Sequence, residues 1–316
     1  MRRRAFVGIT VAALAGCSGT WLTDPRIKGT PQPQLAAVPS RPAGSDQALG
    51  LELAAAAVLN GSAAASWAGS DAARWRSLAE IRRRHAQVLA TDQPLRREPG
   101  LAPSAAARAT GSREAGLAAM TSALTAARDA ELVLAAESSG VLAAFWAALA
   151  ASAQQARTAL TLPVSAARAG VAMRLVQAAG SWDAAANQVL ARLHEAVYGV
   201  QSALGLLPTR HSWRPTVETL LTTLKTDRDA LMAYLRTRSV SPDPGLGAYS
   251  LPPTSGEAKV SALLGGLIDA LTQASAVWVA SAGPEDRRRA ADFLVAASGY
   301  GLPFGLGLAE YPGWPD

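Results

Sequence analysis

A histidine and a glutamate in the first half of the chain have the side chains and the spacing to meet inside a helical protein. His85 follows Leu78 and Ile81 at the steps of three and four residues that mark one face of a helix. Glu131 falls on another apolar stripe, formed by Met120, Leu124, Ala127 and Leu134. We expect both side chains to point inward as a structural pair, because burying either group alone would be costly.

The same two residues could alternatively bind a metal, since imidazole and carboxylate groups are metal ligands. With Glu52 and Glu80 on neighbouring helices, they could form a nonstandard metal site. The alternative metal-binding set is His85, Glu131, His194 and Glu195. The main prediction is that the chain uses no metal and no other cofactor.

The start of the chain is typical of an export signal. Arg2, Arg3 and Arg4 precede an apolar run over residues 5–15, which is too short to span a bilayer. Arg3 and Arg4, followed by Ala-Phe-Val, resemble the twin-arginine export motif. The general secretory route stays open, because Arg2 and Gly8 depart from the residues usual in that motif.

The only cysteine of the 316 residues follows this run, and its position predicts lipidation. Leu14, Ala15, Gly16 and Cys17 resemble the bacterial lipobox, in which a peptidase cleaves before a cysteine that carries diacylglycerol. Residues 1–16 would then be the signal peptide. Two or three acyl chains, palmitate among them, suffice for stable anchoring to the outer face of the cytoplasmic membrane. The alternatives are an ordinary signal with a chance cysteine, or an uncleaved anchor.

The net charge does not favour nucleic acid as a partner. The chain carries +6, and removal of three signal-peptide arginines leaves about +3. We interpret the arginine runs 82–84 and 287–289 as solvated helix faces, with contact to anionic lipid headgroups as the alternative. The expected partners are the membrane, through the lipid anchor, and another envelope protein.

Residues 17–45 contain little that could be buried, and we expect them to form a disordered tether. Its prolines are Pro25, Pro31, Pro33, Pro39 and Pro42. Such a tether would let the folded part stand away from the bilayer.

Beyond residue 45 the pattern predicts an all-α protein. Apolar residues recur at helical spacing, and strand-like runs of β-branched and aromatic residues are missing. Pro284, followed by Glu285 and Asp286, is typical of a helix start. We expect helices near 46–67, 71–90, 113–137, 141–160, 182–205, 213–238, 256–282 and 284–299.

The loop lengths follow the order short, long, short in each half. A long second connection is what a four-helix bundle needs when its second and third helices run parallel, as in ferritin-like folds. We therefore predict two bundles, over residues 46–162 and 182–316, joined by a linker over 163–181. One irregular helical domain with two accidental long loops is the alternative.

Five segments of the second half occur in an order typical of one family: 194–199, 227–231, 248–252, 276–278 and 311–315. Through them, residues 182–316 resemble the small ferritin-like proteins of actinobacteria, a family catalogued as a domain of unknown function and often lipoproteins. The first half looks like a diverged copy. The resemblance implies a ferritin-like fold.

A ferritin-like di-iron centre uses Glu-x-x-His pairs, which this chain does not have. The residues three before His85, His194 and His211 are Arg82, Ala191 and Pro208. The positions at which the family tends to carry ligands look like Leu193 and Leu224 in this chain. Apolar residues at those positions favour a core filled by side chains.

We therefore expect a noncatalytic envelope lipoprotein that serves a binding or scaffolding role. We predict no catalytic residues. The alternative is a divergent metal-binding or redox protein acting through His85, His194 and core glutamates. After the last helix, we expect Phe304, Tyr311 and Trp314 to dock back on the bundle.

Overall fold

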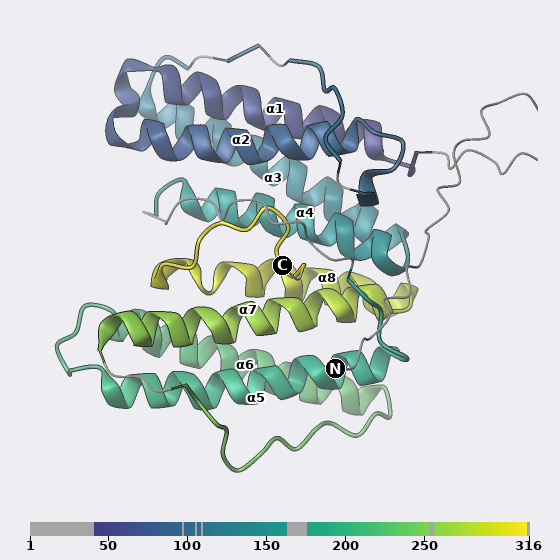
Figure 1. The fold of residues 1–316 in the computed structure, drawn as a ribbon, viewed down its shortest axis with the longest axis vertical. Helices are drawn as coiled ribbons and strands as arrows, with labels where there is room; N and C mark the ends of the chain where they lie inside the picture. Colours follow the sequence, from purple (N-terminus) through teal and green to yellow (C-terminus); the bar gives the residue numbers. More distant parts are fainter. Residues whose placement is uncertain are drawn as a thin grey trace, which may run out of the picture. The chain divides into compact units, whose positions relative to one another are not determined.

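The computed structural model describes residues 41–96, 98–104, 106–108, 110–162, 176–252 and 256–314. These residues form helices and connections, and none of them lies in a strand. The predicted all-α fold is confirmed at this level (Figure 1).

Several predictions concern residues outside this described part. The signal residues Arg3, Arg4, Leu14, Ala15 and Gly16 lie outside it, and so does the lipidation site Cys17. Most of the expected tether and residues 163–175 of the expected linker also lie outside it. These assignments stay predictions.

Eight α helices account for most of the described chain, with ends close to those expected. They are α1 (Ser45–Ala64), α2 (Ala72–Leu89), α3 (Arg113–Glu137), α4 (Gly140–Ala159), α5 (Trp182–Leu206), α6 (Arg214–Thr237), α7 (Glu257–Ser281) and α8 (Pro284–Gly299). Three short 3-10 helices lie between or after them: η2 (Ser66–Asp71), η3 (Pro94–Arg96) and η4 (Leu302–Phe304).

Local signals explain why helices begin where they do. The hydroxyl of Ser112 accepts a hydrogen bond from the backbone N–H of Ala115 at 3.2 Å and so caps α3. Helix α8 begins at Pro284, with Glu285 and Asp286 in its first turn, as predicted. These acids lie at the positive end of the helix dipole.

The helices of the two halves have the same set of neighbours. Helix α1 packs on α2 and α3, and α3 packs on α4. Helix α5 packs on α6 and α7, and α7 packs on α8 (Figure 1). Helix α8 also packs on α3 and α4, and α4 packs on α7, so residues 41–316 form one compact unit.

Helix α4 is buried on all sides. Every residue from Ala143 to Ala153 is buried, which covers three turns of the helix. Its side chains belong to the same core cluster as those of α5, α6, α7 and α8. A helix that is apolar all round belongs at the centre of a protein, and α4 takes that place here.

The long connection between α2 and α3 runs back along α1. The backbone N–H of Arg108 donates to the carbonyl of Ala57 at 3.1 Å. Gly61 allows this approach, since a Cβ at that position would lie 1.9 Å from the carbonyl oxygen of Arg108. The N–H of Gly100 likewise donates to the carbonyl of Gln87 at 2.9 Å, on α2.

Helix α7, from Ala258 to Ser281, is long and apolar enough to cross a membrane. The bent pair Ser45–Ala64 and Ser66–Leu89 passes the same test when taken as one span. In α7, 61% of the apolar stretch is buried inside the structure, as expected for a core helix.

The expectation that both arginine runs are solvated is wrong for one residue in each. Arg82 is fully buried, and Arg287 is 6% exposed. Arg287 donates to the carbonyls of Ala136 and Ala282, at 3.0 and 3.1 Å, near the ends of α3 and α7. A cation is favourable at these negative helix ends, so packing between helices overrides the charge pattern of the run.

Candidate functional site

A cluster of buried polar residues lies between the four helices of the first half. It is formed by Glu52 of α1, Arg82 and His85 of α2, Glu131 of α3 and Ser152 of α4. Four of these side chains are fully buried, and Ser152 is 2% exposed. The prediction that His85 and Glu131 point inward is confirmed, but their expected pairing is wrong, because His85 pairs with Glu52 of α1 instead.

Glu52 is the centre of this cluster. One of its oxygens, Oε1, lies 3.0 Å from Nη1 of Arg82 and 3.0 Å from Nδ1 of His85. The guanidinium of Arg82 also donates to the hydroxyl of Ser152. Burial alone would raise the pKa of Glu52, but the charges of Arg82 and His85 outweigh it and lower that pKa.

Glu131 has the opposite environment. Neither oxygen of its carboxyl group has a hydrogen-bond partner among the described residues. Burial, and then the negative charge of Glu52, raise the pKa of Glu131 well above its ordinary value, in spite of Arg82. The two pKa values are therefore shifted in opposite directions: the surroundings favour the charged form of Glu52 and disfavour the charged form of Glu131.

The segment after α8 covers the cluster. The hydroxyl of Ser152 donates to the carbonyl of Ala309 at 3.3 Å, and Gln155 accepts from the N–H of Ala309 at 3.1 Å. Nε2 of His85 lies 2.8 Å from the carbonyl of Glu310. Since a carbonyl oxygen only accepts, Nε2 donates in this bond.

Aromatic rings extend the same contact, and the predicted docking of the last aromatic residues is confirmed. The ring of Tyr311 lies 4.9 Å from that of His85 and 6.0 Å from that of Phe145. Phe304, Tyr311 and Trp314 are all buried. In Figure 1 this yellow segment leaves α8 and runs toward α4.

The remaining candidate ligands lie elsewhere. Glu80 is 48% exposed and paired with Arg83, because it lies five residues before His85 and so on another face of α2. The alternative in which Glu80 joins His85 and Glu131 at a metal site is therefore wrong. Nε2 of His194 lies 3.2 Å from the carbonyl of Asp243, and Glu195 accepts from Arg192 at 2.6 Å.

Sequence reasoning missed Arg82 as a member of the cluster. A signal was present, because Trp75, Leu78, Arg82 and His85 follow one another at steps of three and four. The neighbouring arginines 83 and 84 hid it by suggesting a charged face.

The donor set does not fit a di-iron centre. Arg82 places a permanent positive charge among the carboxylates, and both ring nitrogens of His85 are already engaged. Within the described ranges, no group of three or more histidine, cysteine, aspartate or glutamate side chains is arranged to hold a metal ion. At the positions where family ligands were expected, Leu193 and Leu224 are fully buried in the core of the second half.

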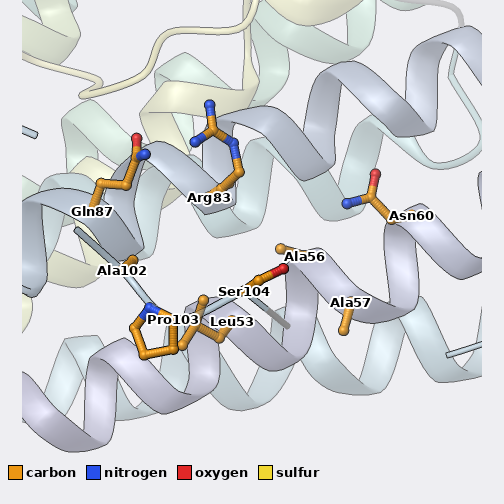
Figure 2. A pocket seen from close by; sticks show the side chains of 9 residues that line it. All are labelled: Leu53, Ala56, Ala57, Asn60, Arg83, Gln87, Ala102, Pro103 and Ser104. Atoms are coloured by element: carbon orange, nitrogen blue, oxygen red, sulfur yellow. The ribbon is translucent and has the colours of Figure 1, made fainter. Parts of the chain in front are cut away.

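A small pocket lies beside α1 and α2, under the first long connection (Figure 2). Leu53, Asn60, Arg83 and Gln87 face residues 102–104 across it. Its volume of about 250 Å³ is below the range of roughly 300–1,000 Å³ typical of ligand pockets. The guanidinium of Arg83 is held by Glu80, so we assign this pocket no function.

Residues 185–316 match the domain of unknown function DUF4439. The resemblance proposed from the sequence covers residues 182–316, nearly the same range. A relation of the second half to a domain of unknown function is therefore confirmed.

A crystal structure of a conserved hypothetical protein, rv2844, from Mycobacterium tuberculosis is similar to part of the chain. The likeness has 26% sequence identity and a TM-score of 0.36, and it covers 39% of this chain and 87% of that chain. No curated protein matches the chain significantly.

Proposed function

We propose that this chain is a bacterial envelope lipoprotein whose ferritin-like helical bundles have a noncatalytic binding or scaffolding role. It is anchored through Cys17 to the outer face of the cytoplasmic membrane after export. The bundles are those expected over residues 46–162 and 182–316, the second being related to the actinobacterial family named above.

The observation that carries the noncatalytic part is the position of Arg82. Its guanidinium lies 3.0 Å from Glu52, at the centre of four helices, where a metal in such a bundle would bind. The arginine neutralises the carboxylate from within the chain, and burial disfavours the charged form of Glu131 that a metal would need. In the second half, leucines fill the corresponding interior.

The repeated neighbour pattern of the helices supports the bundle part of the proposal. In each half the first helix packs on the second and third, and the third packs on the fourth. These contacts are among those that a bundle with one long crossover makes.

Metabolic labelling with an alkyne analogue of palmitate tests the anchor. Full-length chain in a bacterial host should be labelled and should sediment with membranes, and Cys17→Ala should be unlabelled. Ser18→Ala is the matched control and should keep the label. Labelling that persists in Cys17→Ala, or wild-type chain without label, would reject the lipoprotein proposal.

Elemental analysis of the mature chain tests the noncatalytic part against the metal-binding alternative. We expect far less than one iron, manganese or zinc ion per chain, also after incubation with each metal. One tightly held ion per chain that disappears in His85→Ala would establish the alternative and overturn our proposal.

A further inference from the structure

A larger pocket lies between α6 and α8, away from the buried cluster. Its volume is about 570 Å³, within the range of roughly 300–1,000 Å³ typical of small-molecule sites. Two hydrogen bonds beside the pocket link α6 with α8 and its C-cap residue. The hydroxyl of Tyr300 donates to Asp227 at 2.7 Å, and the hydroxyl of Tyr234 donates to Asp286.

One part of the pocket wall is apolar and aromatic. The rings of Trp278 and Phe293 lie 6.1 Å apart in an edge-on arrangement, with Leu231 nearby in the lining. Trp278 is 1% exposed, so neighbouring helices fix its ring in place. This wall suits an apolar stem, and the partly exposed ring of Phe293 can contact a cation through its face.

Asp227 differs from the other acids of the pocket. Asp292 is paired with Arg288 at 3.0 Å, and Glu285 is paired with Arg238. Among the described residues, Asp227 has no positively charged partner, and its hydrogen bond comes from a neutral tyrosine.

The two arginines of the pocket are each in contact with a group other than Asp227. Arg288 is held by Asp292, and the guanidinium of Arg289 lies 4.3 Å from the ring centre of Tyr234. Burial raises the pKa of Asp227, partly against its bond with Tyr300, as expected for a carboxylate whose charge lacks compensation.

We propose that the pocket binds an organic cation, a primary ammonium on an apolar stem. The ammonium lies against Asp227 and the stem against the partly exposed ring of Phe293, which the buried ring of Trp278 supports. Such a group is offered by a lysine side chain of a protein partner or by a free amine. This inference rests on the proposed binding role and specifies its ligand chemistry, but it uses no property of the lipid anchor.

Calorimetric titration of the mature chain tests this proposal with three probes. They are 2-phenylethylammonium, Nα-acetyl-lysine N-methylamide, and 2-phenylethanol as the uncharged counterpart. We expect both ammonium probes to bind and the alcohol not to bind. In Asp227→Asn, the Kd of the ammonium probes should rise by about tenfold or more, which corresponds to about 1.4 kcal/mol.

Asp229→Asn is the matched control, because Asp229 lies on the same helix, is 60% exposed and pairs with Arg228. It should bind as the wild type does. Phe293→Leu is a second variant, which keeps the charge and should weaken binding by removing the ring. Circular dichroism and melting temperature confirm that each variant is folded.

The two natural sources are separated by the two ammonium probes. Tighter binding of the lysine amide indicates a protein partner, and tighter binding of 2-phenylethylammonium indicates a small amine. Either result supports the proposal. Equal binding of the alcohol, equal Kd values in Asp227→Asn and Asp229→Asn, or no binding of any probe at on the order of 10 mM would overturn it. These results do not depend on labelling at Cys17, so the two proposals can fail separately.

Discussion

At the scale of single residues, the buried cluster is an ion pair with added hydrogen bonds. Arg82 and Glu52 are fully buried, and a buried ion pair is tolerated when further donors and acceptors surround it. His85 and Ser152 supply these, and both continue to carbonyls of the segment after α8. The cluster thus connects helices of the first half to the end of the chain.

Replacement of Arg82 by Met should strongly destabilise the protein. The change leaves the carboxylate of Glu52 buried without its main partner, which costs about 3–5 kcal/mol of the free energy of unfolding. Arg83→Met is the control and should change it by less than about 1 kcal/mol, because that pair is exposed. Urea unfolding measures both. Equal losses in the two variants would contradict a central role for Arg82.

Glu131 should make the stability depend on pH in a predictable direction. Its folded pKa is raised from an ordinary 4.5, so its contribution is present below pH 4.5 and is lost as the pH rises through the folded value. Glu131→Gln should remove this loss and raise the free energy of unfolding at pH 8 by about 1–3 kcal/mol relative to wild type. Urea unfolding at pH 5 and pH 8 measures it.

Glu52→Gln serves as the comparison, because its change in the free energy of unfolding should have the opposite sign. The pKa of Glu52 is lowered from 4.5, so its contribution is present above pH 4.5 and is lost as the pH falls through the folded value. This variant should therefore be less stable than wild type at both pH 5 and pH 8. A gain in stability for Glu52→Gln, or a loss for Glu131→Gln at pH 8, would contradict the directions of the two pKa shifts.

At the scale of elements, the long connections are part of the packed structure. The first is tied to α1 through Arg108 and Ala57 and to α2 through Gly100 and Gln87. The second is tied to α5, where Asn187 accepts from the N–H of Asp243 at 2.8 Å. Each connection therefore covers one side of its helix pair.

Gly61→Ala should loosen the first connection. The new Cβ would lie 1.9 Å from the carbonyl oxygen of Arg108. The backbone of the connection must therefore move, which lowers the free energy of unfolding by about 1–3 kcal/mol. Gly50→Ala in the same helix meets nothing within 4 Å and should instead stabilise by about 0.5–1 kcal/mol. Thermal unfolding and the rate of proteolysis near residue 100 measure both. The same sign of change in both variants would contradict the close approach.

At the scale of the whole molecule, the two halves share their core. Phe145 and Trp146 of α4 belong to the core cluster that contains most of the second half. In the other direction, Leu302 and Leu308 pack with Trp75 and Leu124 in the core cluster of the first half. The halves are thus joined in two places by apolar contacts.

Residues 41–162, produced alone, should not form a stable fold. The fragment would expose α4 side chains that are fully buried in the whole chain, and it would lack the segment that covers the buried cluster. Each exposed large aromatic side chain loses about 1.5–3 kcal/mol of burial free energy. Circular dichroism and urea unfolding compare the fragment with residues 41–316. A cooperative transition of the fragment at the urea midpoint of the whole chain would contradict the shared core.

Local sequence patterns predicted the helices and the inward direction of His85 and Glu131. Helix ends follow from capping residues, prolines and glycines, which act within a few residues of chain. The inward faces follow from spacing at three and four residues, which needs no knowledge of the partner helix. The apolar end of the chain similarly predicted docking, because its large aromatic rings favour burial.

Only the tertiary structure decided which residues far apart in the chain are in contact. The burial of Arg82 depends on Glu52 and Ser152, and the cover of His85 depends on a carbonyl 225 residues away. The pocket at Asp227 exists because packing brings residues of α6, α7 and α8 together. A charged or polar side chain takes its state from the partners that surround it, and these partners are fixed only when the helices have packed.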